Sequence, residues 1–422
     1  MTANFWVEQS GVGTEALLSP GEIRLLNQRS FASGDALVDL AGFPRVLNRE
    51  ALTGMLRSIS SRRQAALFYR DGEEVTESDF ARYDANLNLA AIAAKNPVRF
   101  GLVVQRAAMR TYPTHDTVYQ RGMYPDLDRF QENGLFPADA VAVLHASSDG
   151  EWLLVQSYNY LAWVQNSAVA IGSHDDVLQY PDRQNFIVVT GDKVDCELFT
   201  APATRRTLQL DMGVRLPLAA AGEFESSADW PHAAAQRIVV LPRRESGGTL
   251  YFGAALLPED ADVSPGYLPY SRRNLLAQSF KFLGEQYGWG HSLNARDCSG
   301  FIAEVYKSFG IFLPRNSDQQ SRAEIGTSYS FSESDPIEAK AASLESLAPG
   351  DLIYTPGHVM MYVGDLDGEP YVIHDTAGLH YNTASDAQPA RAFGVTVTPL
   401  KPLRASDDRT YVESISTIKK IG

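Results

Sequence analysis

The hydrophobic pattern of this chain changes its period twice. Before residue 96, apolar residues recur at helical spacing, and from Val98 to about residue 262 the spacing falls to near two, with turn residues between short runs. After Pro265 helical spacing returns and is followed by short apolar runs separated by turns. Because such different segments do not build one core, the pattern predicts a multidomain chain.

Length and charge narrow the classes of protein that fit. At 422 residues the chain exceeds the roughly 100–200 residues of a typical domain. Its net charge of −14 argues against a nucleic-acid-binding surface, which needs basic residues. The sequence has no apolar run of about 18 residues, so we expect no transmembrane helix. Its start, Met1–Trp6, lacks a basic segment followed by an apolar core, so the protein is not exported or its signal has been removed.

We predict an N-terminal helical domain over residues 1–95. Ser19 has the form of an N-cap, with Pro20 in the first turn and Glu22 three residues on. Similar helix starts occur at Asn48 and Thr76. We interpret the apolar stripes that follow as core packing, and we assign no chemistry to this segment.

Two small β-barrels are predicted next, over residues 96–173 and 174–262. In the first, Ser148–Gly150 separates the apolar runs 140–145 and 151–155, and Asp-Gly between such runs is a strong hairpin signal. The second region has strands of similar length with less regular spacing.

The last region, residues 263–422, predicts an α+β domain. Ser271 precedes one helix, and a second helix starts at Cys298. Three apolar runs then follow, and we expect them to form adjacent antiparallel strands: 351–354, 358–363 and 371–374.

Cys298 is the candidate nucleophile. It is one of two cysteines, the other being Cys196, and we expect both thiols to be free. A helix N-terminus and an imidazolium from His358 should lower the pKa of the thiol. His358 would take the thiol proton, and His374, 16 residues further on, would orient His358 as the aspartate does in a serine triad.

Two other interpretations of Cys298 remain open. A lone cysteine on a helix is usually a small buried residue, although its neighbours Asp297, Ser299 and Gly300 are unusual for a core position. Cys298 and the two histidines could also bind zinc, but the chain has no Cys-x-x-Cys or His-x-x-x-His pair. We therefore expect no metal and no cofactor.

Several motifs, in order, resemble those of NlpC/P60 cysteine peptidases. They are Asp297–Phe301, Leu347–Leu352, Gly357–Val359, Tyr362–Gly364 and Ile373–His374. The two β-barrels are similar to bacterial SH3 domains, so the whole chain resembles the multidomain branch of that family. This resemblance implies a papain-like C-terminal domain and γ-D-glutamyl-L-diamino acid endopeptidase activity on cell-wall peptides with a free N-terminal L-Ala.

The resemblance also implies further site residues. Asp297, Ser299 and Ser317 would recognise substrate, with Asp297 suited to the free ammonium group. Tyr287 would assist the oxyanion. The first SH3 domain would supply a tyrosine and an acid, and the candidates are Tyr160, then Tyr158, with Asp128 or Glu132. His291 is a departure, because relatives usually carry glycine there.

The expected partner is a peptidoglycan stem peptide, and we expect a monomer in the cell envelope or periplasm, with the cytoplasm as the alternative. Two other functions stay open: a wall-binding protein without activity, and an amidase or acyltransferase on the same fold. The sequence does not distinguish diaminopimelate from lysine in the third position of the peptide, nor intact wall from free peptides.

Overall fold

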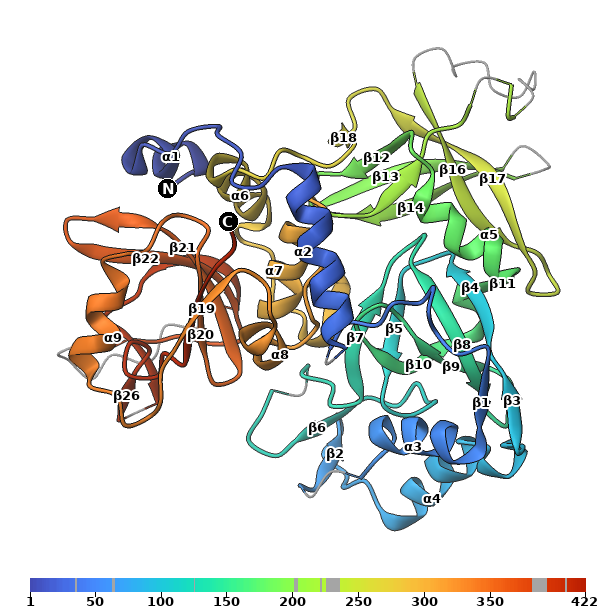
Figure 1. Cartoon of the computed structure of the whole chain (residues 1–422). Helices are drawn as coiled ribbons and strands as arrows, with labels where there is room; N and C mark the ends of the chain where they lie inside the picture. Colours follow the sequence, from blue (N-terminus) through green and yellow to red (C-terminus); the bar gives the residue numbers. More distant parts are fainter. Residues whose placement is uncertain are drawn as a thin grey trace. The chain divides into compact units, whose positions relative to one another are not determined.

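The computed structural model describes residues 1–34, 36–62, 65–124, 126–200, 204–220, 222–224, 236–381, 393–406 and 408–422. The chain divides into two compact units, and Figure 1 labels many of their helices and strands. The C-terminal unit contains Met1–Leu37, Tyr267–Gly288 and Leu293–Gly422, and the central unit contains Val38–Gly266 and Trp289–Ser292. The fold is therefore multidomain, with both helical and β-rich parts.

The largest sheet of the central unit is antiparallel and runs in the order β11-β4-β8-β9-β10-β5-β7. Its strands are β4 (Arg99–Val103), β5 (Ala107–Arg110), β7 (Gln131–Leu135), β8 (Ala140–Ala146), β9 (Trp152–Gln156), β10 (Leu161–Gln165) and β11 (Val169–Gly172). β8 and β9 form the predicted hairpin, and Gly150 in its turn has a φ of 73°. This left-handed conformation explains the glycine.

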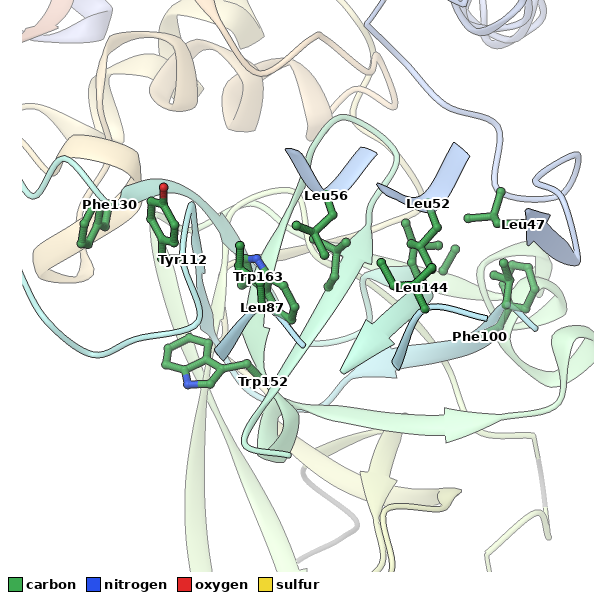
Figure 2. Close-up of a cluster of buried hydrophobic side chains, with 14 of the residues drawn as sticks. Leu47, Leu52, Leu56, Leu87, Phe100, Tyr112, Phe130, Leu144, Trp152 and Trp163 are labelled. Atoms are coloured by element: carbon green, nitrogen blue, oxygen red, sulfur yellow. The ribbon is translucent and has the colours of Figure 1, made fainter. Parts of the chain in front are cut away.

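Two helices pack against this sheet. They are α3 (Arg49–Ile59) and α4 (Glu77–Asn86), and they begin after Asn48 and Thr76 as predicted, with each cap side chain accepting a backbone N–H. Figure 2 shows the shared core, in which Leu52 and Leu56 of α3 lie in one buried cluster with Trp163 of β10. The short strands beside them are β1 (Val46–Asn48), β2 (Leu67–Tyr69), β3 (Lys95–Pro97) and β6 (Val118–Gln120).

The rest of the central unit has its own core around Ile187, Leu210 and Leu241. Its sheets run β14-β13-β17-β16 and β15-β12-β18. The elements are α5 (His174–Gln179), β12 (Phe186–Val189), β13 (Lys193–Thr200), β14 (Thr204–Asp211), β15 (Arg215–Pro217), β16 (Gln236–Arg244), β17 (Leu250–Pro258) and β18 (Val263–Pro265).

The C-terminal unit is built on an antiparallel sheet of order β19-β27-β20-β21-β22-β24. Its strands are β19 (Thr327–Ser330), β20 (Leu352–Thr355), β21 (His358–Leu366), β22 (Glu369–Thr376), β24 (Gly394–Pro399) and β27 (Thr417–Lys420). The three runs predicted to be adjacent strands are β20, β21 and β22, and that prediction is confirmed. A smaller sheet contains β23 (His380–Tyr381), β25 (Leu403–Ser406) and β26 (Arg409–Thr410).

Helices complete this unit. They are α6 (Arg272–Ser279), α7 (Cys298–Lys307), α8 (Ser317–Arg322) and α9 (Ile337–Leu344). α7 starts at Cys298, as predicted, and buries Phe301, Ile302 and Val305. Among the described residues, no helix combines the length and apolar character needed to cross a membrane.

The first two helices of the chain also belong to the C-terminal unit. They are α1 (Ala3–Ser10) and α2 (Pro20–Ser33), and the capping box predicted at Ser19 is present. Trp6 is fully buried, with its ring centroid 5.1 Å from that of Tyr371 on β22. Asn27 of α2 donates to the carbonyl oxygen of Gly310 at 2.7 Å. The helices of residues 1–95 thus divide between the two units, and the division into four domains stays a prediction.

One short segment lies in sequence between two parts of the C-terminal unit but belongs to the central unit. Trp289–Ser292, within the 3₁₀ helix Trp289–Asn294, groups with the central unit. Gln131 of β7 donates to the Gly290 carbonyl at 2.7 Å, and the Trp289 indole donates to the Gln131 carbonyl at 3.0 Å. Gly290 has a φ of 58°, and a Cβ there would lie 2.8 Å from Gln131, so this close approach needs glycine.

Candidate active site

Cys298 is the first residue of α7. Asp297 caps the helix, because its Oδ1 accepts the backbone N–H of Gly300 at 2.9 Å. The Cys298 sulfur lies 4.0 Å from the carbonyl oxygen of Gly357, the residue before His358. The thiol therefore sits where the α7 N-terminus meets the start of β21. In the described structure Cys298 and Cys196 are both free, as predicted.

A chain of polar side chains crosses three neighbouring strands behind the thiol. Nε2 of His358 on β21 lies 2.8 Å from Nδ1 of His374 on β22. Nε2 of His374 lies 3.0 Å from Oγ1 of Thr398 on β24. The ring of Tyr411 meets the ring of His358 at a centroid distance of 5.9 Å. Both nitrogens of His374 are therefore engaged, and Nε2 of His358 is engaged by His374.

This arrangement suits proton transfer in one tautomeric state. When His374 donates from Nε2 to Thr398, its Nδ1 can accept the N–H of His358 Nε2. Nδ1 of His358 then carries a lone pair for the Cys298 proton. In this state the Thr398 hydroxyl accepts from His374, and His374 holds the protonated imidazole of His358 that follows.

The pKa of the thiol differs from the sequence-based expectation. Burial, reinforced by the Asp297 carboxylate, raises the pKa of Cys298 to about 12, whereas a lowered pKa was expected. Burial also lowers the pKa of His358 to about 4 and that of His374 well below its usual range. The expected imidazolium is therefore absent from this described site at neutral pH. These shifts favour a neutral thiol and a neutral imidazole, the forms from which general-base catalysis starts.

A buried ion pair holds the residues on either side of the nucleophile. Arg315 donates to both oxygens of Asp297, at 2.5 Å and 3.1 Å, and to Oγ of Ser299 at 2.9 Å. Gln320 of α8 donates to the Ser299 carbonyl at 3.1 Å. Asp297 therefore has a structural task in addition to the predicted recognition of an ammonium group, which stays a prediction.

Tyr287 and Ser317 are the other predicted site residues of this unit. Tyr287 precedes α7 in the sequence, and Ser317 follows it. The backbone N–H of Gly288, next to Tyr287, donates to the Arg296 carbonyl at 2.6 Å. Burial, and next the charge of an ionised Cys298, raise the pKa of Tyr287 well above its usual range, so its hydroxyl stays a donor near the sulfur. Ser317 is the first residue of α8 and is largely buried.

The remaining predicted residues lie in the central unit. Tyr160 donates from its hydroxyl to Glu132 at 2.7 Å, so Glu132 is the acid that accompanies it. Asp128 instead pairs with Arg110 at 2.7 Å and accepts backbone N–H groups. The buried His291 ring packs on Phe136, with centroids 5.4 Å apart. The part that these residues play in the reaction stays a prediction.

Sequence reasoning missed four side chains around the thiol and the two histidines: Arg315, Asp375, Thr398 and Tyr411. Two of them adjoin predicted positions, since Arg315 precedes Ser317 by two residues and Asp375 follows His374. Thr398 and Tyr411 have no such signal, because only strand pairing and packing bring them near the histidines. No group of three His, Cys, Asp or Glu side chains in the described ranges could hold a metal ion.

Two protein-family models match the chain. The NlpC/P60 family model matches residues 284–392, and the model of an SH3 domain of the SH3b1 type matches residues 120–165. The first match spans Cys298, His358 and His374, and the second ends at Gln165, the last residue of β10.

Curated relatives match parts of the chain. A γ-D-glutamyl-L-lysine dipeptidyl-peptidase from Bacillus cereus is 29% identical over 199 residues, covering 44% of this chain and 50% of the relative. A protein named probable endopeptidase p60 from Listeria welshimeri is 36% identical over 97 residues, covering 22% of this chain and 16% of the relative. The matches thus span half of these relatives or less.

One solved structure resembles the chain over nearly its full length. It is described as an NlpC/P60 endopeptidase from Photobacterium damselae subsp. piscicida, with a TM-score of 0.77 and 18% identity. The match covers 99% of this chain and 96% of that one. At this identity, the likeness concerns the fold.

Proposed function

Because the chain carries an NlpC/P60 domain and an SH3 domain of the SH3b1 type, we propose that it is a cysteine peptidase of peptidoglycan stem peptides. It hydrolyses the bond between γ-D-Glu and the diamino acid in peptides with a free N-terminal L-Ala. The observation that supports this most is the hydrogen-bonded row of His358, His374 and Thr398, together with the Cys298 thiol at a helix N-terminus, 4.0 Å from the Gly357 carbonyl oxygen.

The reaction begins when Cys298 attacks the γ-carbonyl carbon of D-Glu while Nδ1 of His358 accepts the thiol proton. Backbone N–H groups of the first turn of α7 and the Tyr287 hydroxyl donate to the oxyanion that forms. His358 returns the proton to the departing amine of the diamino acid. Water, deprotonated by His358, then hydrolyses the thioester and releases L-Ala-D-Glu.

Recognition of the peptide end is assigned to the residues beside the nucleophile. Asp297, Ser299 and Ser317 hold the peptide near Cys298, and the carboxylate of Asp297 is suited to the free ammonium of L-Ala. The Bacillus cereus relative is named for a γ-D-glutamyl-L-lysine bond, which makes lysine one candidate for the third residue, beside diaminopimelate. The NlpC/P60 and SH3b1-type domains favour the cell envelope as the protein's compartment.

The test uses L-Ala-γ-D-Glu-meso-diaminopimelate, its L-Lys counterpart and the N-acetylated form of each, with products identified by mass spectrometry. We expect the wild type to release L-Ala-D-Glu from the free peptides and to cleave the acetylated forms at least about tenfold more slowly, because a buried charge loses its partner. Equal cleavage of free and acetylated peptides would refute the assigned selectivity.

Two cysteine variants separate catalysis from folding. Cys298→Ala should abolish release, whereas Cys196→Ala, in the core of the central unit, should retain it. Retained cleavage by Cys298→Ala would refute the mechanism. Binding of insoluble wall by wild type without turnover of any peptide would favour a wall-binding protein, and a product other than L-Ala-D-Glu would favour an amidase or acyltransferase.

A further inference from the structure

Asp375 is a buried acid for which the proposed mechanism has no task. It follows His374 on β22, so its side chain points to the opposite face of the sheet. Its exposed fraction is 0%, and within the described residues neither carboxylate oxygen has a hydrogen-bond partner. A buried polar group without a partner is rare and calls for an explanation.

The charged groups around Asp375 are mostly acidic. Asp297 and Glu285 raise the pKa of its carboxyl and Arg296 lowers it, while Asp375 in turn raises the pKa of Cys298 and of Tyr287. On the other side, β24 pairs Val395 with Asp375, and the sequence of β24 contains no titratable residue. Asp375 therefore lies among the groups that surround the α7 N-terminus.

The two nearby arginines are already engaged by other carboxylates. Arg296 contacts Glu285 at 2.9 Å and Glu304 at 2.8 Å, and Arg315 contacts Asp297 at 2.5 Å. An ionised Asp375 would therefore add a negative charge with no counter-ion of its own in this described cluster. Burial accordingly raises the pKa of Asp375 well above its usual range, and Asp297 and Glu285 raise it further.

We propose that Asp375 is a positioning residue that acts through Cys298: it is a neutral acid in the active form of the protein, and its ionisation opposes formation of the thiolate. The proposal rests on the proposed role of Cys298 as the nucleophile. A neutral acid leaves Asp297 as the main carboxylate acting on the sulfur, and its partner Arg315 offsets that charge. An ionised Asp375 adds a second carboxylate on the strand that α7 packs against, so thiolate formation becomes less favourable as pH rises.

Alkylation of Cys298 by iodoacetamide tests this without a peptide substrate. Mass spectrometry of the Cys298 peptide gives its rate constant between pH 6 and pH 10 and separates it from Cys196. Asp375→Asn has the same shape and cannot ionise. The matched control is Asp365→Asn on β21, which is exposed and whose amide oxygen can still accept the Gly368 N–H.

We expect Asp375→Asn and the wild type to react at similar rates at the acid end of this range, where Asp375 is neutral, and the variant to react roughly tenfold faster once Asp375 of the wild type has ionised, because two buried charges then oppose each other. Asp365→Asn should follow the wild type throughout. Profiles of Asp375→Asn and wild type that superimpose within twofold, or a variant slower at every pH, would overturn the proposal. Should the variant not fold, the wild type alone decides: its rate must rise by less than tenfold per pH unit over the stretch in which Asp375 ionises, and a uniform tenfold rise to pH 10 overturns the proposal.

Thermal unfolding gives an independent reading of the same acid. Because the pKa of Asp375 in the folded protein is raised above its unfolded value, its contribution to stability is complete at low pH and is lost as pH rises through the folded pKa. Asparagine has no such loss. The melting temperature of Asp375→Asn minus that of the wild type should therefore increase between pH 4 and pH 8. A difference that does not change with pH refutes the proposal.

The failure of this proposal is distinguishable from the failure of the proposed function. Cleavage of L-Ala-γ-D-Glu peptides with superimposed alkylation profiles keeps the function and rejects the role of Asp375. Separated profiles without peptide cleavage keep the role of Asp375 and reject the function.

Discussion

Replacing Arg315 with leucine would measure how much the Arg315–Asp297 ion pair at the N-terminus of α7 contributes to the stability of the C-terminal unit. Arg315 and Asp297 have side chains only 4% and 8% exposed, and the two groups meet at 2.5 Å. Removing one partner of such a pair leaves a buried charge uncompensated, at a cost of about 3–5 kcal/mol. At 1.4 kcal/mol per factor of ten, this cost predicts roughly 100- to 4,000-fold faster hydrogen exchange. The prediction applies to those amides of α7 that exchange only when the unit unfolds.

Hydrogen-exchange mass spectrometry of peptides covering α7 provides the assay, because it reports on the C-terminal unit separately from the central one. The control is Arg322→Leu on α8, where Arg322 and Asp318 form an ion pair with side chains 69% and 64% exposed. Exposed pairs contribute little, so this variant should exchange within about fivefold of wild type.

A double variant makes the reasoning refutable. In Asp297→Asn with Arg315→Leu, neither charge remains, and asparagine still caps α7 through its amide oxygen. This double variant should exchange more slowly than Arg315→Leu alone. Exchange in Arg315→Leu that matches Arg322→Leu, or single effects that add without coupling, would show that the pair does not stabilise this helix.

Three further predictions follow from the site and its support. Thr398→Val keeps the side-chain shape but removes the partner of His374 Nε2, so kcat should fall about tenfold at constant KM, and an unchanged kcat would contradict the proposed tautomer. Burial lowers the pKa of His358 to about 4, so activity should be lost only as pH falls toward 4, where the base becomes protonated, and a kcat/KM profile with an acid limb near 6.5 would contradict this. Trp6→Ala should destabilise the C-terminal unit by about 3–5 kcal/mol, seen as faster exchange in β21 and β22 with unchanged exchange in β8.

Features with a local cause could be predicted from the sequence. The capping box at Ser19 involves a side chain three residues away, and the hairpin between β8 and β9 depends on one turn. The start of α7 at Cys298 is of the same kind, because Asp297 supplies the cap. Each needs only neighbouring residues, and the chemistry of those residues is visible in the sequence.

Features that depend on tertiary burial could not be predicted in this way. The helix N-terminus suggested a lowered pKa for Cys298, but enclosure of the sulfur raises it, and enclosure has no local signal. The engagement of Asp297 by Arg315 joins residues 18 apart, and the packing of Trp6 on Tyr371 joins the first helix to a strand near the end of the chain. Such contacts follow from the assembled fold.

The packing of α1 and α2 with the last third of the chain has a consequence for synthesis. Residues 1–37 are synthesised before their partners in the same unit, which begin at Tyr267, after the 229 residues of Val38–Gly266. At about 5–20 residues per second, these helices wait roughly 10–45 s before the first of their partners emerges. The central unit can fold during that interval, whereas the C-terminal unit folds only after its segments beyond Tyr267 have been made. Nascent chains therefore expose the apolar side of Trp6 while Val38–Gly266 is synthesised, and this is the stage at which a chaperone would have the most to protect.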